Sequence, residues 1–370
     1  MSTAPQHCPG PHELDDLDLM AVGVLAPRVN APGSTVTLDL PAGVRDEAAA
    51  AGVVELTDPE GAPIARVTWP AGEVTTLGRV EHGPFRRLRL APEQAHGVFA
   101  GRPVLVARTP LDAEQSALVR EEGAAVLAIV GHGVARPGAV AVLRSCLEAT
   151  PWVVAVPLAA HPEVEDEVLA AYVDPDRVLT APSAAEEGSV DDAVADGPPE
   201  GGLVVLFTGL SGSGKSTLAR ALTDHLLEQG RSVTSLDGDV VRRHLSTGLG
   251  FSVADRETNV RRIGWVAAQI AHHGGVAVCS PIAPFARTRA EVRSMTHDAG
   301  ARFVLVHVST PLAECERRDR KGLYAKARAG EIPEFTGISS PYEEPDDADV
   351  VVDTTGRSVD DALADVLAAL

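Results

Sequence analysis

The residues with the most specific chemical meaning lie in the stretch Gly209-Leu-Ser-Gly-Ser-Gly-Lys-Ser216, which fits the pattern G-x-x-x-x-G-K-[ST] in full. An apolar run precedes this stretch and a helical pattern follows it. Glycines at these positions let backbone N–H groups line an anion site at the positive end of a helix. The sequence therefore predicts that the phosphates of ATP bind to Gly209, Leu210, Ser211, Gly212, Ser213, Gly214, Lys215, Ser216 and Thr217.

Two side chains of this loop have separate expected roles. Lys215 would place a positive charge beside the β- and γ-phosphates, and the Ser216 hydroxyl would be a ligand of Mg²⁺. GTPases, ATPase motors and small-molecule kinases all use such a loop. A motor or switch ATPase normally carries an acidic residue at the end of a later apolar strand, whereas the strand expected at 276–279 ends in Ser280. This difference favours a kinase.

Two carboxylates follow the second expected strand, in the segment Leu-Asp237-Gly-Asp239. The carboxyl ends of parallel strands meet at one edge of a sheet, so both should face the phosphate loop. We expect Asp237 to bind the metal together with Ser216, and both Asp237 and Asp239 to take part in catalysis. The alternative is an Asp-Gly-Asp turn on the surface.

The next segment carries Arg242 and then Phe251, Arg256, Asn259 and Arg261 at helix-like spacing. Charges on a helix are most often a solvated face. Arginines beside a phosphate site in an acidic protein are also the expected partners of an anionic acceptor, because they bind phosphate through two parallel hydrogen bonds. Phe251 would either stack on a planar base or belong to the core.

The elements that must position these residues alternate between strands and helices, which is typical of an α/β domain with a parallel sheet flanked by helices. We expect this phosphate-loop kinase domain to cover residues 203–370. Its strands are predicted at 203–208, 232–236, 276–279, 303–308 and 349–352. Its helices are predicted at 216–229, 255–273, 287–299, 311–319 and 358–369.

The residues before this domain divide into three predicted parts. Residues 1–92 read as a β-rich domain, because short alternating segments such as 34–41, 53–69 and 85–92 are joined by turns. Residues 93–180 read as an α/β unit with buried parallel strands near 103, 125 and 152. Residues 181–202 are rich in Ala, Ser, Gly, Pro and acids, which predicts a linker.

The overall composition limits the partners and the compartment. With 32 basic and 52 acidic residues the net charge is −20, which argues against binding to nucleic acid or to an anionic membrane. The N-terminus lacks the basic and apolar regions of a signal peptide. No stretch reaches the roughly 18 apolar residues of a membrane span. We therefore expect a cytoplasmic protein, and the four scattered cysteines indicate neither a disulfide framework nor a metal site.

Several segments together resemble the adenylylsulfate kinase (APS kinase) family over about 170 residues, 201–370. They are GLSGSGKST, LDGD with Arg242, GFSVADRETNVRR, SPIAPFARTR and TPLAECERRDRKGLYAKARAGEIPEFTGISSPYEEP. The resemblance implies transfer of a phosphoryl group from ATP, with Mg²⁺, to the 3′-hydroxyl of adenosine 5′-phosphosulfate (APS), which gives 3′-phosphoadenosine 5′-phosphosulfate (PAPS). This is a step of sulfate assimilation.

The resemblance also implies roles for single residues. Arg242, Arg256 and Asn259 would hold the phosphosulfate and ribose, Phe251 and Phe335 would enclose the adenine of APS, and Lys321 would belong to a lid. Ser280 matches a serine that the family treats as a phosphoserine intermediate, so the chain would be a phosphoprotein. The chain departs from the family at Arg320, where a proline is expected, and in the turn SPIAPFARTR.

The mechanism implied by the resemblance needs little covalent chemistry, because phosphoryl transfer passes through a loose transition state. Lys215, Mg²⁺ and a lid arginine, Arg317 or Arg318, would neutralise the γ-phosphate. Asp239, with Asp237 as the alternative, would accept the proton of the 3′-hydroxyl. We expect direct transfer without a phosphoserine at Ser280.

The first 180 residues resemble ATP sulfurylase, with a β-rich (PUA-like) N-terminal domain and a truncated nucleotidyltransferase-like α/β unit. That family carries Gln-x-Arg-Asn-Pro followed by two histidines. Here Arg108 and Pro110 remain, but the glutamine position is Val106 and the histidine positions are Asp112 and Gln115. A carboxylate repels polyphosphate, so we expect this half to lack sulfate adenylyltransferase activity.

Two further functions remain as alternatives. One is a kinase of another small acceptor, such as a nucleoside monophosphate or gluconate. The other is a nucleotide-binding regulator whose N-terminal half senses APS. For partners we expect ATP and APS, a second copy in a homodimer, and association with an active ATP sulfurylase, but neither nucleic acid nor membrane.

Overall fold

The computed structural model describes residues 4–31, 34, 36–58, 63–79, 83–130, 137–158, 164–180, 201–319 and 322–370. The chain forms two compact units, Met1–Val194 and Ala195–Leu370. Residues 181–200 of the predicted linker lie outside the described residues. Among the described residues, no helix is both long and apolar enough to cross a membrane.

The second unit is built on a five-stranded sheet in which every neighbouring pair is parallel. Its strand order is β12-β11-β8-β10-β9. The strands are β8 (Leu203–Thr208), β9 (Val233–Leu236), β10 (Val276–Cys279), β11 (Arg302–Val308) and β12 (Val350–Val352). A parallel sheet leaves all strand ends at one edge, and the phosphate loop follows the central strand β8 at that edge.

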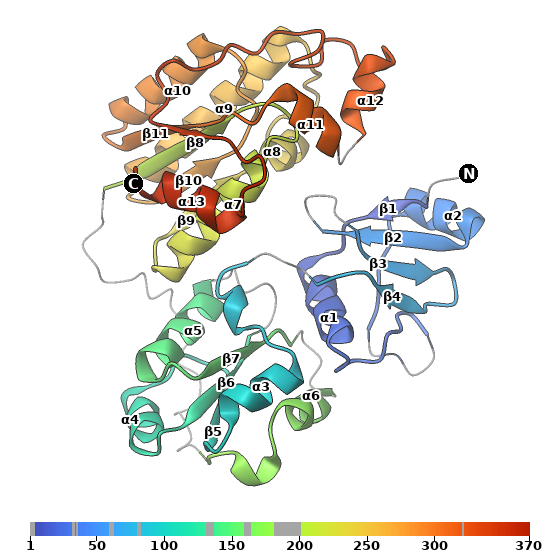
Figure 1. Ribbon diagram of the computed structural model, residues 1–370, viewed down its shortest axis with the longest axis vertical. Coiled ribbons are helices and arrows are strands. Elements are labelled where there is room, and N and C mark those ends of the chain that lie inside the picture. The colour runs from blue at the N-terminus through green and yellow to red at the C-terminus, as the bar shows by residue number, and fades with distance from the viewer. Residues whose placement is uncertain are drawn as a thin grey trace. The chain divides into compact units, whose positions relative to one another are not determined.

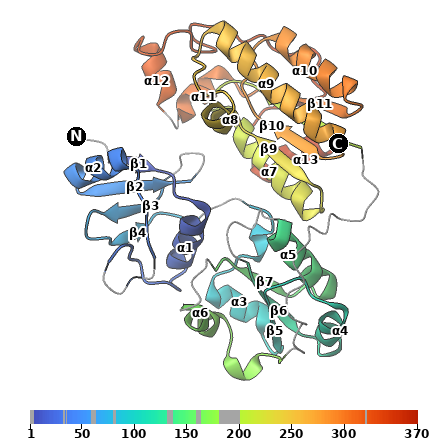
Figure 2. The same ribbon diagram turned by 180° about the vertical axis from the view of Figure 1, so that it is seen from behind.

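Helices cover both faces of this sheet, as Figures 1 and 2 show from opposite sides. Val205 and Phe207 of β8 pack with α7 (Lys215–Glu228) and α13 (Val359–Leu367). Val204 and Leu206 pack on the other face with α9 (Val253–His272) and α10 (Ala286–Asp298). Successive side chains of a strand point to opposite faces, so a strand buried on both sides reads as a continuous apolar run.

The predicted α/β architecture with a parallel sheet flanked by helices is confirmed, and each strand and long helix predicted for this unit is present within a few residues. Three short helices accompany them: α8 (Gly238–His244), α11 (Leu312–Arg318) and α12 (Leu323–Arg328). Only α11 was predicted.

The described residues of the first unit form two sheets. In the first, β1 (Gln6–His7) pairs in parallel with β2 (Val53–Thr57), and β2, β3 (Pro63–Thr68) and β4 (Val74–Thr76) pair antiparallel. Helices α1 (Pro11–Ala21) and α2 (Ala42–Ala51) belong to the same part.

The second sheet of this unit is parallel, with the order β5-β6-β7. Its strands β5 (Val104–Ala107), β6 (Ala125–Ile129) and β7 (Val153–Val156) confirm the buried parallel strands predicted near 103, 125 and 152. The helices of this part are α3 (Pro92–Phe99), α4 (Ala113–Glu121), α5 (Pro137–Ala149) and α6 (Glu165–Tyr172).

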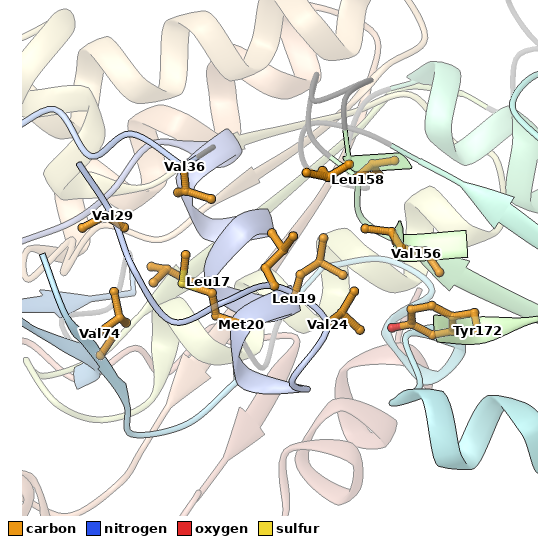
Figure 3. Close-up of a cluster of buried hydrophobic side chains, with 14 of the residues drawn as sticks. Leu17, Leu19, Met20, Val24, Val29, Val36, Val74, Val156, Leu158 and Tyr172 are labelled. Atoms are coloured by element: carbon orange, nitrogen blue, oxygen red, sulfur yellow. The ribbon is translucent and has the colours of Figure 1, made fainter. Parts of the chain in front are cut away.

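One hydrophobic cluster joins the two sheets of the first unit (Figure 3). Leu17, Leu19 and Met20 of α1 belong to the same cluster as Val74 of the first sheet and Val156 of the second. Tyr172 of α6 also belongs to it, and its hydroxyl donates to the Leu90 carbonyl at 3.1 Å. The predicted division of this half at 92/93 remains a prediction, and the two sheets share one core.

Two strand predictions in the first half are wrong. Residues 36–41 form no strand, although the alternate residues Val36, Leu38 and Leu40 are buried as the pattern predicted. The Asn30 side chain bonds both the N–H and the C=O of Leu38, and the backbone N–H of Asn30 donates to the Val36 C=O at 3.0 Å.

The second wrong prediction is the strand at 85–92. Phe85 has a φ of 56°, and Leu88 N–H donates to Phe85 C=O at 2.8 Å. These residues therefore form the 3₁₀ turn η1 (Arg86–Leu88) and lead into α3.

Candidate active site

The phosphate loop connects β8 to α7 and depends on glycine for its shape. Gly209, Gly212 and Gly214 have φ values of 147°, 74° and 99°, which other residues rarely adopt. A Cβ atom on Gly209 would lie 2.5 Å from the Val308 carbonyl oxygen, so this position also has no room for a side chain. Gly214 is the N-cap of α7, whose first N–H groups have no partner within the helix. The loop is therefore shaped as an anion site.

Lys215 is buried at the start of α7, and its Nζ donates to the Leu210 carbonyl at 2.6 Å. The ammonium group thus lies across the loop instead of extending into solvent. This contact also ties the two ends of the loop together. The positive charge is held where a bound polyphosphate would need it.

Asp237, one of the two metal ligands expected from the sequence, accepts hydrogen bonds from the other, Ser216, and from Ser280. Its Oδ2 accepts the hydroxyls of Ser216 at 3.1 Å and of Ser280 at 3.0 Å. Its Oδ1 accepts the backbone N–H of Asp239 at 2.9 Å and caps α8. The structure therefore brings Ser216, Asp237, Asp239 and Ser280 together at the strand ends, as their positions in the sequence predict.

The donors around Asp237 Oδ2 fit a magnesium ion. Mg²⁺ prefers oxygen ligands and usually binds through one or two protein side chains, with the remaining positions taken by water and substrate phosphates. One carboxylate and two hydroxyls offer only oxygen. Among the described residues there is no group of three or more His, Cys, Asp or Glu side chains that could hold a metal by themselves.

Arg242 and Phe251 lie together although they come from different elements. Arg242 of α8 lies over the Phe251 ring at 4.5 Å, and its Nη1 donates to the Gly250 carbonyl at 2.9 Å. Burial lowers the pKa of the Arg242 guanidinium. Phe251 is 66% exposed, so the structure excludes the alternative that its ring belongs to the core.

Arg256 and Asn259 lie one turn apart on α9 and are buried. Arg256 donates to the Thr336 hydroxyl at 2.7 Å and to the Ser340 hydroxyl at 2.8 Å. Within the described residues, Nε of Arg256 and Oδ1 of Asn259 have no hydrogen-bond partner. Buried polar atoms without partners are uncommon, and a bound ligand is one way to satisfy them.

Phe335 contacts Tyr324, and Tyr324 in turn bonds to the phosphate loop. The two rings make an edge contact with their centroids 5.0 Å apart, and the Tyr324 hydroxyl donates to the Ser211 carbonyl at 2.8 Å. A cavity of about 540 Å³ is lined mostly by the segment that follows Phe335. Its lining residues are Leu210, Leu312, Gly337, Ile338, Ser339, Ser340, Pro341, Tyr342 and Glu344. Lys321 and Arg320 lie outside the described residues.

The two candidate lid arginines are both paired with Glu314. Arg317 is exposed and donates to both carboxylate oxygens of Glu314, at 2.6 and 2.8 Å. Arg318 donates to Glu314 at 2.8 Å and to the Thr354 hydroxyl at 2.9 Å. These hydrogen bonds from Arg317 and Arg318 lower the pKa of Glu314 to about 2. Contact of either arginine with a γ-phosphate therefore remains a prediction.

Sequence reasoning missed several side chains that shape this site. Thr310 and Thr354 contact the phosphate loop, Tyr324 bonds to it, and Thr336 and Ser340 hold Arg256. Thr310 and Thr354 follow the ends of β11 and β12 at the edge where the loop lies, so the strand-end rule that selected Asp237 could have found them.

The first-unit residues that stand at the positions of the ATP sulfurylase motif have structural partners. Arg108 forms an ion pair with Glu165, with Nε 2.9 Å from the carboxylate. Asp112 is the N-cap of α4: its carboxylate accepts the N–H of Gln115 at 2.8 Å, and the Gln115 side chain accepts the N–H of Asp112 at 3.3 Å. These two residues form a capping box that starts the helix.

The phosphate loop joins the central parallel strand β8 to α7. The carboxylate that contacts this loop is Asp237, which follows β9, and not a residue of β10. These features define the second unit as a phosphate-loop kinase. The family can also be stated. The sequence model of the adenylylsulphate kinase family matches residues 201–353. The chain is 56% identical over 169 residues to an adenylyl-sulfate kinase of Chloroflexus aurantiacus, a match that covers 46% of this chain and 89% of that protein. The chain belongs to the adenylylsulfate kinase family.

Two further relatives illustrate how the match is distributed. A sulfate adenylyltransferase of Aspergillus terreus is 48% identical over 170 residues, but the match covers only 30% of that protein and 46% of this chain. The solved structure of the Mycobacterium tuberculosis APS kinase in complex with AMPPNP and APS is 49% identical, with a TM-score of 0.45. That match covers 46% of this chain and 98% of the solved one.

Proposed function

We propose that the chain transfers the γ-phosphoryl group of ATP to the 3′-hydroxyl of APS, giving ADP and PAPS. The observation that carries this proposal is the 56% identity to an adenylyl-sulfate kinase over 89% of that relative's length. The intact phosphate loop and the cluster around Asp237 supply the chemistry that such a transfer needs. The reaction activates sulfate.

The nucleotide-binding part of the proposal assigns ATP to the loop from Gly209 to Thr217. Backbone N–H groups at the start of α7 and the buried ammonium of Lys215 would hold the β- and γ-phosphates. Arg317 would also contact the γ-phosphate, but only after its two hydrogen bonds to the Glu314 carboxylate break.

A magnesium ion would bind at Ser216 and Asp237, with Ser280 beside them. When bound, Mg²⁺ neutralises charge on the phosphate oxygens. Asp237 orients both hydroxyls because the same oxygen, Oδ2, accepts from each. The Ser280 hydroxyl donates a hydrogen bond to Asp237, which supports a role in holding that carboxylate. Transfer in this proposal is direct, without a phosphoserine.

The acceptor part of the proposal assigns APS to Arg242, Phe251, Arg256, Asn259, Lys321 and Phe335. The exposed Phe251 ring offers a face for an adenine, and the unpartnered Nε of Arg256 and Oδ1 of Asn259 offer a donor and an acceptor for its anionic and ribose groups. Asp239, in the first turn of α8, would accept the proton of the 3′-hydroxyl.

The finer proposals for the first unit are a PUA-like first part, a nucleotidyltransferase-like second part, and loss of sulfate adenylyltransferase activity. Loss of activity is supported by the capping box, which occupies Asp112 and Gln115, and by the ion pair that neutralises Arg108. Three further points stay predictions: a cytoplasmic location, a homodimer, and association with an active ATP sulfurylase. Light scattering of the full chain tests whether it is a homodimer.

The test of the function is a turnover assay on the full chain with Mg-ATP and APS. The proposal expects ADP and PAPS in equal amounts. Gluconate and nucleoside monophosphates serve as competing acceptors. ADP release that APS does not stimulate, but another acceptor does, would show that the acceptor is misassigned. Nucleotide binding without any transfer would favour the regulator instead.

A further inference from the structure

Two threonines from separate strand ends contact one carbonyl of the phosphate loop. Ser213, directly before Gly214, is fully buried. Its carbonyl oxygen accepts from the Thr310 hydroxyl at 3.0 Å and from the Thr354 hydroxyl at 2.9 Å. The two hydroxyl oxygens lie 2.8 Å apart. Three oxygens therefore form a triangle behind the loop, on the side of β11 and β12.

A proton count decides what this triangle can do. Each hydroxyl has one proton, so at most two of the three contacts are hydrogen bonds at any moment. Thr354 Oγ1 accepts from Arg318 Nη1 at 2.9 Å, and Thr310 Oγ1 accepts from the Thr354 N–H at 3.2 Å. Both hydroxyl protons are thereby left for the triangle. Whichever two contacts form, the Ser213 carbonyl receives at least one hydrogen bond.

The direction of this carbonyl sets the direction of the next N–H group. In a trans peptide the carbonyl of Ser213 and the N–H of Gly214 point to opposite sides. A Cβ atom on Gly214 would lie 3.3 Å from the Thr354 side chain, so Thr354 also packs against this residue. Holding the carbonyl toward the threonines therefore turns the Gly214 N–H away from them, at the start of α7 where an anion would bind.

We infer that Thr310 and Thr354 are a pair of positioning residues that hold the phosphate loop in its anion-binding shape, and that one hydroxyl alone retains most, but not all, of this effect. The inference rests on the proposed function only in that a nucleotide polyphosphate occupies the loop. It assigns no role to the acceptor.

The test measures binding of MgADP and MgATP to the full chain by calorimetry, without any acceptor. Thr310→Val and Thr354→Val each leave one donor, and we expect affinity to fall about twofold to threefold. The double variant leaves none, and we expect a fall of more than about tenfold that exceeds the product of the two single effects. Thr310→Ser and Thr354→Ser keep the hydroxyl and should bind like the wild type.

Thr296→Val is the matched control, because Thr296 is fully buried and its hydroxyl donates to the Val292 carbonyl at 2.9 Å within α10. It should lower the melting temperature without changing nucleotide affinity. A double variant that binds like this control overturns the inference, as does a single variant as weak as the double. If the double variant does not fold, the single variants decide. A small loss of nucleotide affinity in Thr310→Val or Thr354→Val that the serine variant does not show supports the inference. No loss of affinity, or an equal loss in the serine variant, overturns it. Because no acceptor is present, these results are independent of whether APS is the substrate.

Discussion

At the scale of single residues, Asp237 combines two functions that are usually separate. Its Oδ1 caps α8 and its Oδ2 holds the hydroxyls of Ser216 and Ser280. Asp239, in contrast, is exposed in the first turn of α8. This difference supports assigning the metal to Asp237 and proton transfer to Asp239.

Replacing Asp239 by Asn should therefore act mainly on the chemical step. A base that works in the transition state contributes about 10²–10⁴-fold, so kcat should fall by that order while the KM for APS changes little. Steady-state kinetics with varied APS measure both constants. Asp360→Asn, in the first turn of α13, is a control on an exposed carboxylate. A variant that loses APS affinity and retains kcat would contradict the assignment.

Replacing Ser280 by Ala should leave substantial activity. In the proposed direct transfer the side chain holds Asp237 and is not the nucleophile. One hydrogen bond contributes about 0.5–1.5 kcal/mol, which corresponds to about twofold to thirteenfold in rate. The KM for Mg²⁺ should rise, because Asp237 loses one of the groups that orient it. Complete loss of activity, together with γ-phosphate label trapped on Ser280 of the wild-type protein, would establish the phosphoserine route instead.

At the scale of elements, α9 and the segment 336–340 are joined through one guanidinium. Arg256 donates to Thr336 and Ser340, and its Nε has no partner among the described residues. The arginine can therefore act in two ways: it can hold the segment beside the phosphate loop, and it can bind an anionic acceptor.

Arg256→Ala should weaken APS binding about 10-fold to 100-fold, because hydrogen bonds to a charged group are lost, while ATP binding is nearly unchanged. The double variant Thr336→Val/Ser340→Ala separates the two roles. It removes the two hydroxyl partners of the arginine but keeps its charge and its ion pair with Glu334, 3.9 Å away, so it should lose much less APS affinity if Arg256 contacts the substrate. Equal losses of APS affinity in both variants would indicate that the arginine only holds the segment. Parallel losses of ATP affinity would place Arg256 elsewhere.

The strand β11 carries a buried titratable group, His307, which stacks on Tyr342 with a centroid distance of 5.9 Å. Burial lowers the pKa of His307. The unfolded chain therefore binds this proton more readily than the folded protein, and stability falls as the pH drops below about 6.5, where an exposed histidine titrates. Between pH 7.5 and 5.5 the melting temperature should fall more for the wild type than for His307→Gln. The exposed His297→Gln should behave like the wild type, and parallel pH profiles for wild type and His307→Gln would refute this prediction.

At the scale of the whole molecule, the chain consists of two compact units, and the family match lies in one of them. The first unit has a core of its own that includes α1, both sheets and Tyr172. Its Asp112 and Gln115 form the capping box at the start of α4.

We therefore expect that residues 1–180, a fragment that covers most of the first unit, release no pyrophosphate from ATP and sulfate when inorganic pyrophosphatase is present to pull the reaction. Adenylyl transfer needs neutral or cationic donors on the departing pyrophosphate, and losing one such donor typically costs about 10²–10³ in rate. Residues 200–370 alone should retain turnover of ATP and APS, which serves as the positive control. Sulfate-dependent turnover by residues 1–180 would mean that the capping box does not exclude substrate.

The sequence by itself was sufficient for the features that depend on local pattern. The apolar runs predicted β8, β10 and β11, because strands buried on both faces need apolar residues at every position. The glycine spacing predicted the phosphate loop, because left-handed backbone and close packing admit little else. The strand-end rule also placed Asp237 correctly beside Ser216.

Only the tertiary structure decided the contacts between segments far apart in the chain. Val36, Leu38 and Leu40 are buried as their alternation predicted, yet they form no strand, because the side chain of Asn30 takes the hydrogen bonds of Leu38. Thr310 and Thr354 reach the Ser213 carbonyl from 97 and 141 residues away. The strand-end rule could place these threonines near the loop, but a hydroxyl carries no local pattern that names its partner. Their contact with the Ser213 carbonyl therefore appears only when the parallel sheet brings three strand ends to one edge.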